Sequence, residues 1–89
     1  MICDVFIEIS KDSNIKYEYD KELGTIRLDR VLKSSMVYPE NYGYIPNTLA
    51  DDGDALDVIL VADYPLVPGS YVGSRIVGVL EMEDEKGID

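Results

Sequence analysis

Apolar and polar residues alternate in several short segments of this 89-residue chain, a pattern typical of β-strands with one buried face. The alternation is clear over residues 3–9, 15–20 and 25–30, and turn-forming residues separate these segments. Consecutive strands joined by short turns predict an antiparallel meander. A short apolar run at 57–62 and a longer run at 70–83 predict further strands, and two glycines in the longer run predict a bulge or bend.

Residues 37–54, VYPENYGYIPNTLADDGD, contain prolines, glycines and other turn formers, so this segment is expected to be mostly loop with short extended pieces. No segment shows a helical period over three turns. The expected fold class is therefore mainly β: a single domain over residues 1–89, built as a small, distorted five-stranded barrel of the oligonucleotide/oligosaccharide-binding type.

Eighteen acidic residues against eight basic ones give a net charge of −10, which disfavours binding to nucleic acids and anionic membranes. The lone Cys3 cannot form an internal disulfide and is compatible with a reducing compartment. Neither a signal peptide nor a membrane-spanning apolar stretch is visible. A cytoplasmic protein is expected.

The segment DDGDALDV, residues 51–58, concentrates like charge directly before a predicted strand. Crowded carboxylates repel one another unless a cation offsets their charge, and Mg²⁺ prefers such oxygen ligands. A solvated acidic turn explains the same residues equally well. A calcium EF-hand is excluded, because aligning Gly53 places Thr48 and Ala50 where acidic ligands are required.

Three further groups carry candidate chemistry. Asp84 and Asp89 flank a glycine turn and could share one cation, although a frayed acidic terminus explains them as well. A basic group at strand ends could bind an anion, although such side chains usually extend to solvent; it comprises Lys16 and Arg30, with Glu18 beside them. The phenol hydroxyls of a tyrosine cluster could donate hydrogen bonds to phosphate, or its rings could simply cover the core; it comprises Tyr38, Tyr42 and Tyr44.

Seven segments, taken together and in order, resemble the soluble inorganic pyrophosphatases of family I. They are IEI, KYEYD, LDR, YPENYGYIPNT, DDGDALDV, PLVPG and VGVLEMEDEKGID. The resemblance runs through essentially the whole chain. It implies hydrolysis of pyrophosphate to two phosphates by water that Mg²⁺ activates, with several ions in each site and Mn²⁺ as a possible substitute. It also implies a homo-oligomer, a hexamer in bacterial relatives.

The resemblance implies a role for each matching residue. The metal ligands would be Glu8, Asp52, Asp57, Asp84 and Asp89. The substrate-binding group would comprise Lys16, Arg30 and Tyr42, with Glu18 and Tyr38 in the surrounding network. Asp54 would accept the proton of the attacking water, and Asp89 is the next candidate for that catalytic role.

The chain departs from the family pattern in three places. Ser10 and Ala55 stand where prolines are common, and we expect only local loosening from these changes. Family members also continue beyond Asp89 with a lysine and a Tyr-Lys pair that binds phosphate, so the chain resembles an N-terminal portion, with the barrel incomplete at its C-terminus. Weak or absent activity is therefore expected for this chain alone. A non-enzymatic acidic barrel that binds metal or a partner protein is the alternative.

Overall fold

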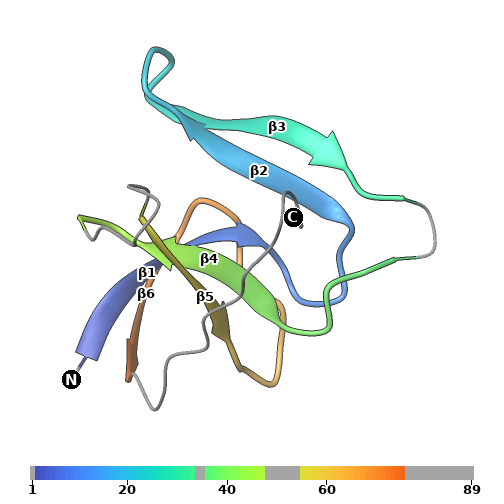
Figure 1. Ribbon diagram of the computed structural model, residues 1–89, viewed down its shortest axis with the longest axis vertical. Helices are drawn as coiled ribbons and strands as arrows, with labels where there is room; N and C mark the ends of the chain where they lie inside the picture. Colours follow the sequence, from blue (N-terminus) through green and yellow to red (C-terminus); the bar gives the residue numbers. More distant parts are fainter. Residues whose placement is uncertain (1, 34–35, 48–54, 76–89) are drawn as a thin grey trace.

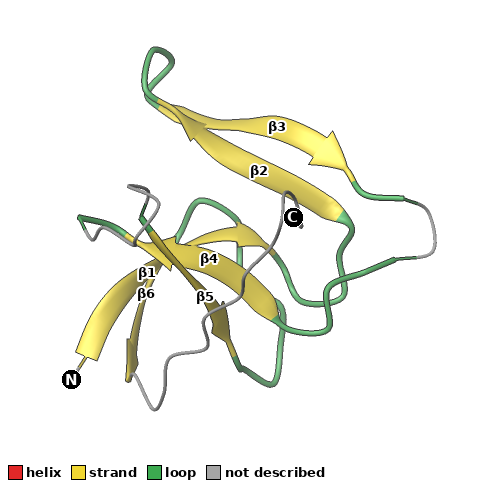
Figure 2. Ribbon diagram, viewed as in Figure 1, coloured by secondary structure: helices red, strands yellow, loops and turns green. Residues whose placement is uncertain are grey.

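The computed structural model describes residues 2–33, 36–47 and 55–75, and every regular element in these ranges is a strand (Figure 2). The strands are β1 (Ile2–Ile9), β2 (Ile15–Asp20), β3 (Thr25–Val31), β4 (Asn41–Ile45), β5 (Leu56–Leu60) and β6 (Tyr71–Arg75). The expected mainly-β class is confirmed. None of the described elements is a helix long and apolar enough to cross a membrane. The predicted strand at 70–83 is described only as far as residue 75.

The strands form two separate sheets. One is antiparallel and four-stranded, in the order β5-β4-β1-β6, and the other is the β2–β3 hairpin (Figure 1). Within the described ranges these six strands do not close into a barrel. The predicted meander is correct for β2 and β3 but wrong for β1, because β1 pairs with β4 and β6 instead. The connection between β1 and β2 hydrogen-bonds to the segment that precedes β4. Asp12 N–H donates to the carbonyl of Tyr38 at 2.6 Å, and Tyr38 N–H donates to the carbonyl of Ser13 at 3.0 Å.

Strand β4, residues 41–45, lies inside the segment that was expected to be mostly loop with short extended pieces, and it is one such piece, paired as a regular strand. Its burial alternates as a strand requires, with Asn41, Gly43 and Ile45 buried and the two intervening tyrosines partly exposed. Two of the three buried positions are asparagine and glycine rather than aliphatic residues. The hydrophobic alternation that identifies a strand in sequence is therefore missing.

Side chains pack against both faces of β1. On one face Val5, Ile7 and Ile45 form the buried core, with partly buried apolar side chains packed around them: Cys3, Leu56, Val58, Leu60, Leu66 and Val72. On the other face the ring of Phe6 lies 5.2 to 6.2 Å, between centroids, from the rings of Tyr19, Tyr44 and Tyr71. Because Tyr19 belongs to β2, this aromatic cluster joins the hairpin to the four-stranded sheet.

The backbones of β1 and β4 approach each other closely at Gly43, which pairs with Ile7. A Cβ atom at position 43 would overlap the carbonyl oxygen of Phe6 and lie 2.8 Å from its carbonyl carbon. Backbone atoms of a central strand cannot move aside as a flexible side chain can. Only glycine fits at this point of the sheet.

The fully buried side chain of Asn41 connects three segments of the chain. Its Oδ1 accepts hydrogen bonds from the backbone amides of Lys11 at 2.8 Å and Leu66 at 2.9 Å. Its Nδ2 donates to the carbonyl of Tyr64 at 3.2 Å. The β1–β2 and β5–β6 connections are thus both fixed to the first residue of β4, and the buried amide group has partners for both its atoms.

Pairing among the described strands contains two irregularities, neither of them at Gly73, and the other predicted glycine, Gly78, lies outside the described residues. The β1–β6 register runs without a shift through Gly73. Instead, the register shifts between Ile7 and Ile9 against β4, and again between β2 and β3, where Lys16 pairs with Arg30 but Tyr17 pairs with Leu28. Glu8 and Asp29 are therefore the extra residues of two bulges, which turn side chains out of the regular alternation.

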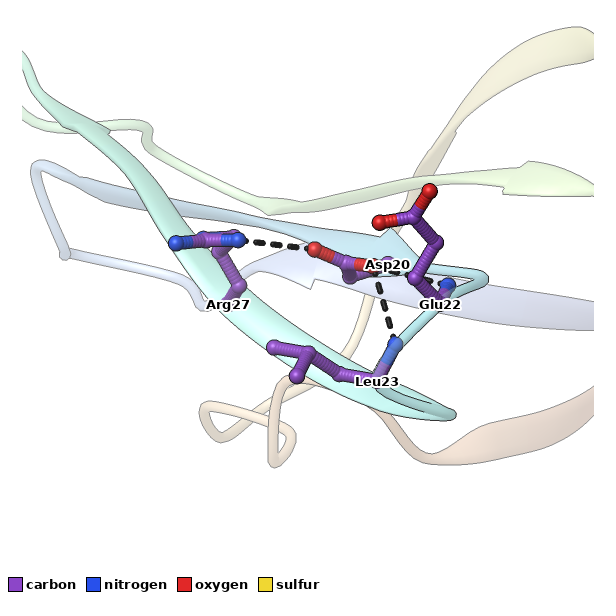
Figure 3. Close-up of polar contacts among 4 residues, drawn as sticks. All are labelled: Asp20, Glu22, Leu23 and Arg27. Atoms are coloured by element: carbon purple, nitrogen blue, oxygen red, sulfur yellow. Dashed lines mark hydrogen bonds and ion pairs between the residues drawn. The ribbon is translucent and has the colours of Figure 1, made fainter.

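The hairpin turn between β2 and β3 is organised by Asp20 (Figure 3). Its Oδ1 accepts the amides of Glu22 and Leu23 at 2.9 and 3.0 Å, and its Oδ2 accepts a 2.9 Å bond from Arg27. These donors lower the pKa of Asp20, with the Leu23 amide as the largest cause and Arg27 next. The predicted turn at residues 21–24 is confirmed.

We expect Asp20→Asn to destabilise the chain near neutral pH and to lose that effect in acid. A lowered carboxyl pKa contributes stability that is present above the ordinary value of 3.8 and is lost as the pH falls through the lower folded-state value. Thermal unfolding from pH 6 to pH 2 checks this. Glu22→Gln removes a carboxylate from the same turn without removing these bonds, and should show no such convergence. Parallel melting curves for parent and Asp20→Asn would contradict the assignment.

Gly43→Ala should destabilise the fold by about 3 kcal/mol, because the added methyl group overlaps the β1 backbone. Urea unfolding measures the change. The matched control is Gly73→Ala on β6, where a Cβ would meet Asp4 Oδ1 at 3.8 Å, an ordinary contact. That variant should stay within about 1 kcal/mol of the parent. Equal effects from the two substitutions would remove the special role of Gly43.

Candidate active site

Seven of the predicted site residues lie in the described part of the chain, on both sheets. Glu8 is on β1, Tyr42 is on β4 and Asp57 is on β5, whereas the hairpin carries the basic group. That group comprises Lys16 on β2 and Arg30 on β3, with Glu18 beside them on β2, and Tyr38 precedes β4. The other four lie outside the described residues: Asp52, Asp54, Asp84 and Asp89.

Pairing of β4 with β5 places Asp57 opposite Tyr44, two residues along β4 from Tyr42 and therefore on the same face as a diagonal neighbour. The Tyr42 hydroxyl hydrogen-bonds to the Asp57 side chain. Burial, and then the charge of Asp57 and this hydrogen bond, raise the pKa of Tyr42 well above its usual range. Tyr42 therefore keeps its proton at all physiological pH values and acts as a hydrogen-bond donor.

The bulge in β1 sets Glu8 beside this pair. Burial raises the pKa of Glu8 from 4.5 to about 7, and Lys16 opposes the shift while Asp57 adds to it. The influence of Lys16 comes from the hairpin and that of Asp57 from β5, so Glu8 lies where the two sheets face each other. A half-buried carboxylate in these surroundings is held partly protonated near neutral pH.

Two cations meet across the hairpin. Lys16 pairs with Arg30 in the β2–β3 register, and the bulge brings Asp29 to the same place. The Oδ2 atom of Asp29 lies 3.7 Å from Lys16 Nζ and 3.9 Å from Arg30 Nε. Glu18 pairs with Arg27 one step further along the hairpin. Lys16 and Arg30 therefore lie together, with the carboxylate of Asp29 between them.

The two predicted tyrosines pack against each other, with ring centroids 5.4 Å apart for Tyr38 and Tyr42. The backbone of Tyr38 is bonded to residues 12 and 13, which lie between Glu8 and Lys16 in the sequence. The tyrosine segment and the β1–β2 connection are therefore built as one unit. This unit holds Tyr42 toward Asp57 and leads the chain into the hairpin.

Asp29 and Asn41 were not recognised as site or support residues in the sequence. The sequence around Asp29 alternates regularly, and this pattern predicts Asp29 on the face of the strand opposite to Arg30. Only the bulge brings the two side chains together. Asn41 stands among turn formers, where an asparagine is unremarkable. Nothing in a single sequence distinguishes a buried bridging amide from an exposed one.

The described residues contain no group of three or more carboxylate, histidine or cysteine side chains that could hold a metal ion by itself. Glu8 and Asp57 nevertheless suit a hard divalent cation. They are carboxylates close enough for Asp57 to raise the pKa of Glu8, so a positive ion between them would relieve both the repulsion and the burial of charge. The donor set fits Mg²⁺, with further ligands required from elsewhere.

One pocket of the described residues lies away from this chemistry. A groove of about 430 Å³ between the hairpin and the sheet is lined mainly by the aromatic cluster and the turn residues around it, Phe6, Tyr19, Gly24, Thr25, Ile26, Pro68, Gly69 and Tyr71. None of the predicted site residues lines it. The candidate site is defined by converging charges rather than by this groove.

Comparison with known proteins agrees with this reading. The model of the inorganic pyrophosphatase family matches residues 5–89. The chain is 54% identical over 88 residues to the inorganic pyrophosphatase of Sulfolobus acidocaldarius, covering 99% of this chain and 51% of that protein. It is 53% identical over 88 residues to that of Thermus thermophilus, covering 99% of this chain and 50% of the relative.

Solved structures give the same result. The crystal structure of the Thermus thermophilus inorganic pyrophosphatase superposes with a TM-score of 0.78 at 49% identity, covering 84% of this chain and 43% of the other. The Helicobacter pylori structure gives 0.76 at 53% identity, covering 83% and 44%. The chain spans about half the length of the relatives it matches. It belongs to the inorganic pyrophosphatase family.

Proposed function

We propose that this chain carries part of the active site of a Mg²⁺-dependent hydrolase that converts inorganic pyrophosphate to two phosphates. The observation that carries the proposal is the meeting of two opposite charge clusters. Lys16 and Arg30 lie together on the hairpin, and Glu8 and Asp57 lie together on the four-stranded sheet. Lys16 and Asp57 both influence the pKa of Glu8, which connects the two clusters.

The hairpin cluster supplies the positive charge that a polyanionic substrate needs. In a chain of net charge −10, two cations side by side form a local exception. Lys16 and Arg30 would bind phosphoryl oxygens and offset the charge that develops on them during transfer. Tyr42, which keeps its proton, can donate a hydrogen bond to the same anion without adding charge.

The sheet cluster would hold the metal. We propose Glu8 and Asp57 as ligands from the described part, with Asp52, Asp84 and Asp89 completing the set. When bound, Mg²⁺ would neutralise substrate charge and lower the pKa of a water molecule. In this assignment Asp54 accepts the proton that the attacking water loses, and Asp89 remains the second candidate for that role. Glu18 and Tyr38 would support Lys16 and Tyr42 from the neighbouring positions.

The non-enzymatic alternative is a small acidic module that binds metal alone. It accounts for Glu8 and Asp57 but gives no purpose to a pair of cations aligned across a strand pair. A nucleic-acid-binding role would need a broad basic face, which −10 net charge disfavours. The pairing of Lys16 with Arg30 is therefore the feature that favours the hydrolase.

The proposal is tested on two proteins. One is this chain, and the other, the chimera, is the Thermus thermophilus protein with its matching segment replaced by this chain. Release of phosphate from pyrophosphate is measured with and without Mg²⁺. Lys16→Ala and Arg30→Ala should each lower kcat/KM by about 10²–10³, since each removes a preorganised cation from the developing charge. KM should rise as well, because the cations also meet the substrate in its ground state.

Lys21→Ala is the matched control, because Lys21 is an exposed cation on the turn of the same hairpin. Its kcat/KM should stay near that of the parent chimera. An inactive parent chimera that still binds Mg²⁺ would support the metal-binding module instead. Equal losses for Lys16→Ala and Lys21→Ala would mean that general charge, rather than the paired cations, is what the substrate needs.

Glu8→Gln should have opposite effects on stability and on metal binding. Without divalent ions at pH 8 it removes a half-buried charge facing Asp57, so the melting temperature should rise by several degrees, where about 1 kcal/mol corresponds to about 4–8 °C. In calorimetric titration the same variant should bind Mg²⁺ more weakly, because a ligand is lost. Asp4→Asn on the same strand is the control and should leave Mg²⁺ affinity unchanged. A Glu8→Gln chain with parental Mg²⁺ affinity would exclude Glu8 from the metal site.

A further inference from the structure

Asp29 occupies a position that regular strand geometry would not allow. Neighbouring residues of a strand point to opposite faces, so Asp29 should lie away from Arg30. The register shift opposite Lys16 and Tyr17 makes Asp29 the extra residue of a bulge, and its carboxylate comes to the side of the hairpin that carries the cations. The bulge therefore places a carboxylate next to two cations on the same side of the hairpin.

A single oxygen atom of Asp29 contacts both cations. Oδ2 lies 3.7 Å from Lys16 Nζ and 3.9 Å from Arg30 Nε, distances of ion pairs rather than of direct hydrogen bonds. Lysine and arginine have long side chains with many rotamers, and two adjacent cations repel each other. A carboxylate between them opposes that repulsion and restricts both side chains.

The ion pairs of Asp29 are long and partly accessible to solvent. The side chains of Asp29 and Arg30 are 30% and 46% exposed, so this pair is weak, whereas Lys16 is 16% exposed and its pair with Asp29 is better shielded. An acidic group beside an anion-binding pair also repels the anion. The position of the Asp29 carboxylate is therefore explained better by an effect on the arrangement of the two cations than by folding stability or by substrate affinity.

We infer that Asp29 is a positioning residue, which holds the side chains of Lys16 and Arg30 in a fixed relative orientation so that both can contact oxygen atoms of a phosphoryl group. The inference rests on the proposed function for its kinetic consequence only. Precise placement of charged groups provides a large part of the rate in phosphoryl transfer, and small misplacements cost up to about a hundredfold. Removing Asp29 should therefore lower kcat although it leaves both cations in the protein.

The orientation is tested on the 89-residue chain without substrate. Side-chain ¹⁵N NMR follows the Arg30 Nε–Hε and Lys16 Nζ resonances in the parent, Asp29→Asn, Asp29→Glu and Asp20→Asn. We expect Asp29→Asn to shift and broaden both resonances, and Asp29→Glu to restore them in part. Asp20→Asn breaks the Arg27 contact in the same hairpin with the same change of charge, so it should move the Arg27 resonance and leave that of Arg30 in place. Unchanged Arg30 and Lys16 resonances in Asp29→Asn would overturn the inference.

Kinetics of the same variants in the chimera supply the second test. Asp29→Asn should lower kcat by about tenfold to a hundredfold with a smaller change in KM, Asp29→Glu should recover part of kcat, and Asp20→Asn should stay near the parent. A fall in KM with unchanged kcat would mean that Asp29 only competes with substrate, and would overturn the inference. If the parent chimera releases no phosphate, the proposed function fails, and the NMR result still decides whether Asp29 orients the cations.

Discussion

The close contact between the backbones of β1 and β4 at Gly43 is the constraint on which the rest of the structure depends. Because position 43 has no side chain, the Phe6 carbonyl can lie against it and the two central strands can pair. This pairing puts Tyr42 beside the β1 bulge, and the next strand, β5, adds Asp57. The sheet half of the site therefore follows from one backbone contact that tolerates no larger residue.

The two halves of the site use the same local device. Each contains a bulge whose extra residue is acidic, Glu8 in β1 and Asp29 in β3. Asp29 is among the charges that raise the pKa of Glu8, and Lys16 opposes that rise, so the bulged regions lie within electrostatic reach of each other. Bulges in place of regular strand let the four-stranded sheet and the hairpin present charged side chains to the space between them, while aliphatic side chains fill the core on the opposite face of β1.

The sequence predicts the elements better than their arrangement. Alternation locates β1, β2 and β3 nearly to the residue, and the order of motifs identifies the family. The bounds of strand β4 are not located, because Asn41 and Gly43 occupy its buried positions for reasons of hydrogen bonding and close approach, which hydrophobic patterns do not record. The partners of β1 and the position of Asp29 depend on register shifts, and a register shift leaves no trace in a period-two pattern. Of the site residues on described strands, Lys16 and Arg30 pair on the hairpin and Glu8 lies within electrostatic reach of Lys16 and Asp57, while the role of each residue is a proposal.

The bridging amide of Asn41 has a consequence for how the chain opens. Its two atoms hold the backbone of residues 11, 64 and 66, which are far apart in the sequence, and all three bonds are lost together if the side chain leaves its buried place. The amides of Lys11 and Leu66 share one acceptor atom, so a single opening of the Asn41 side chain exposes both to exchange with solvent hydrogen. Loss of this one side chain from its buried place would therefore release both connections together from the strand that carries Tyr42.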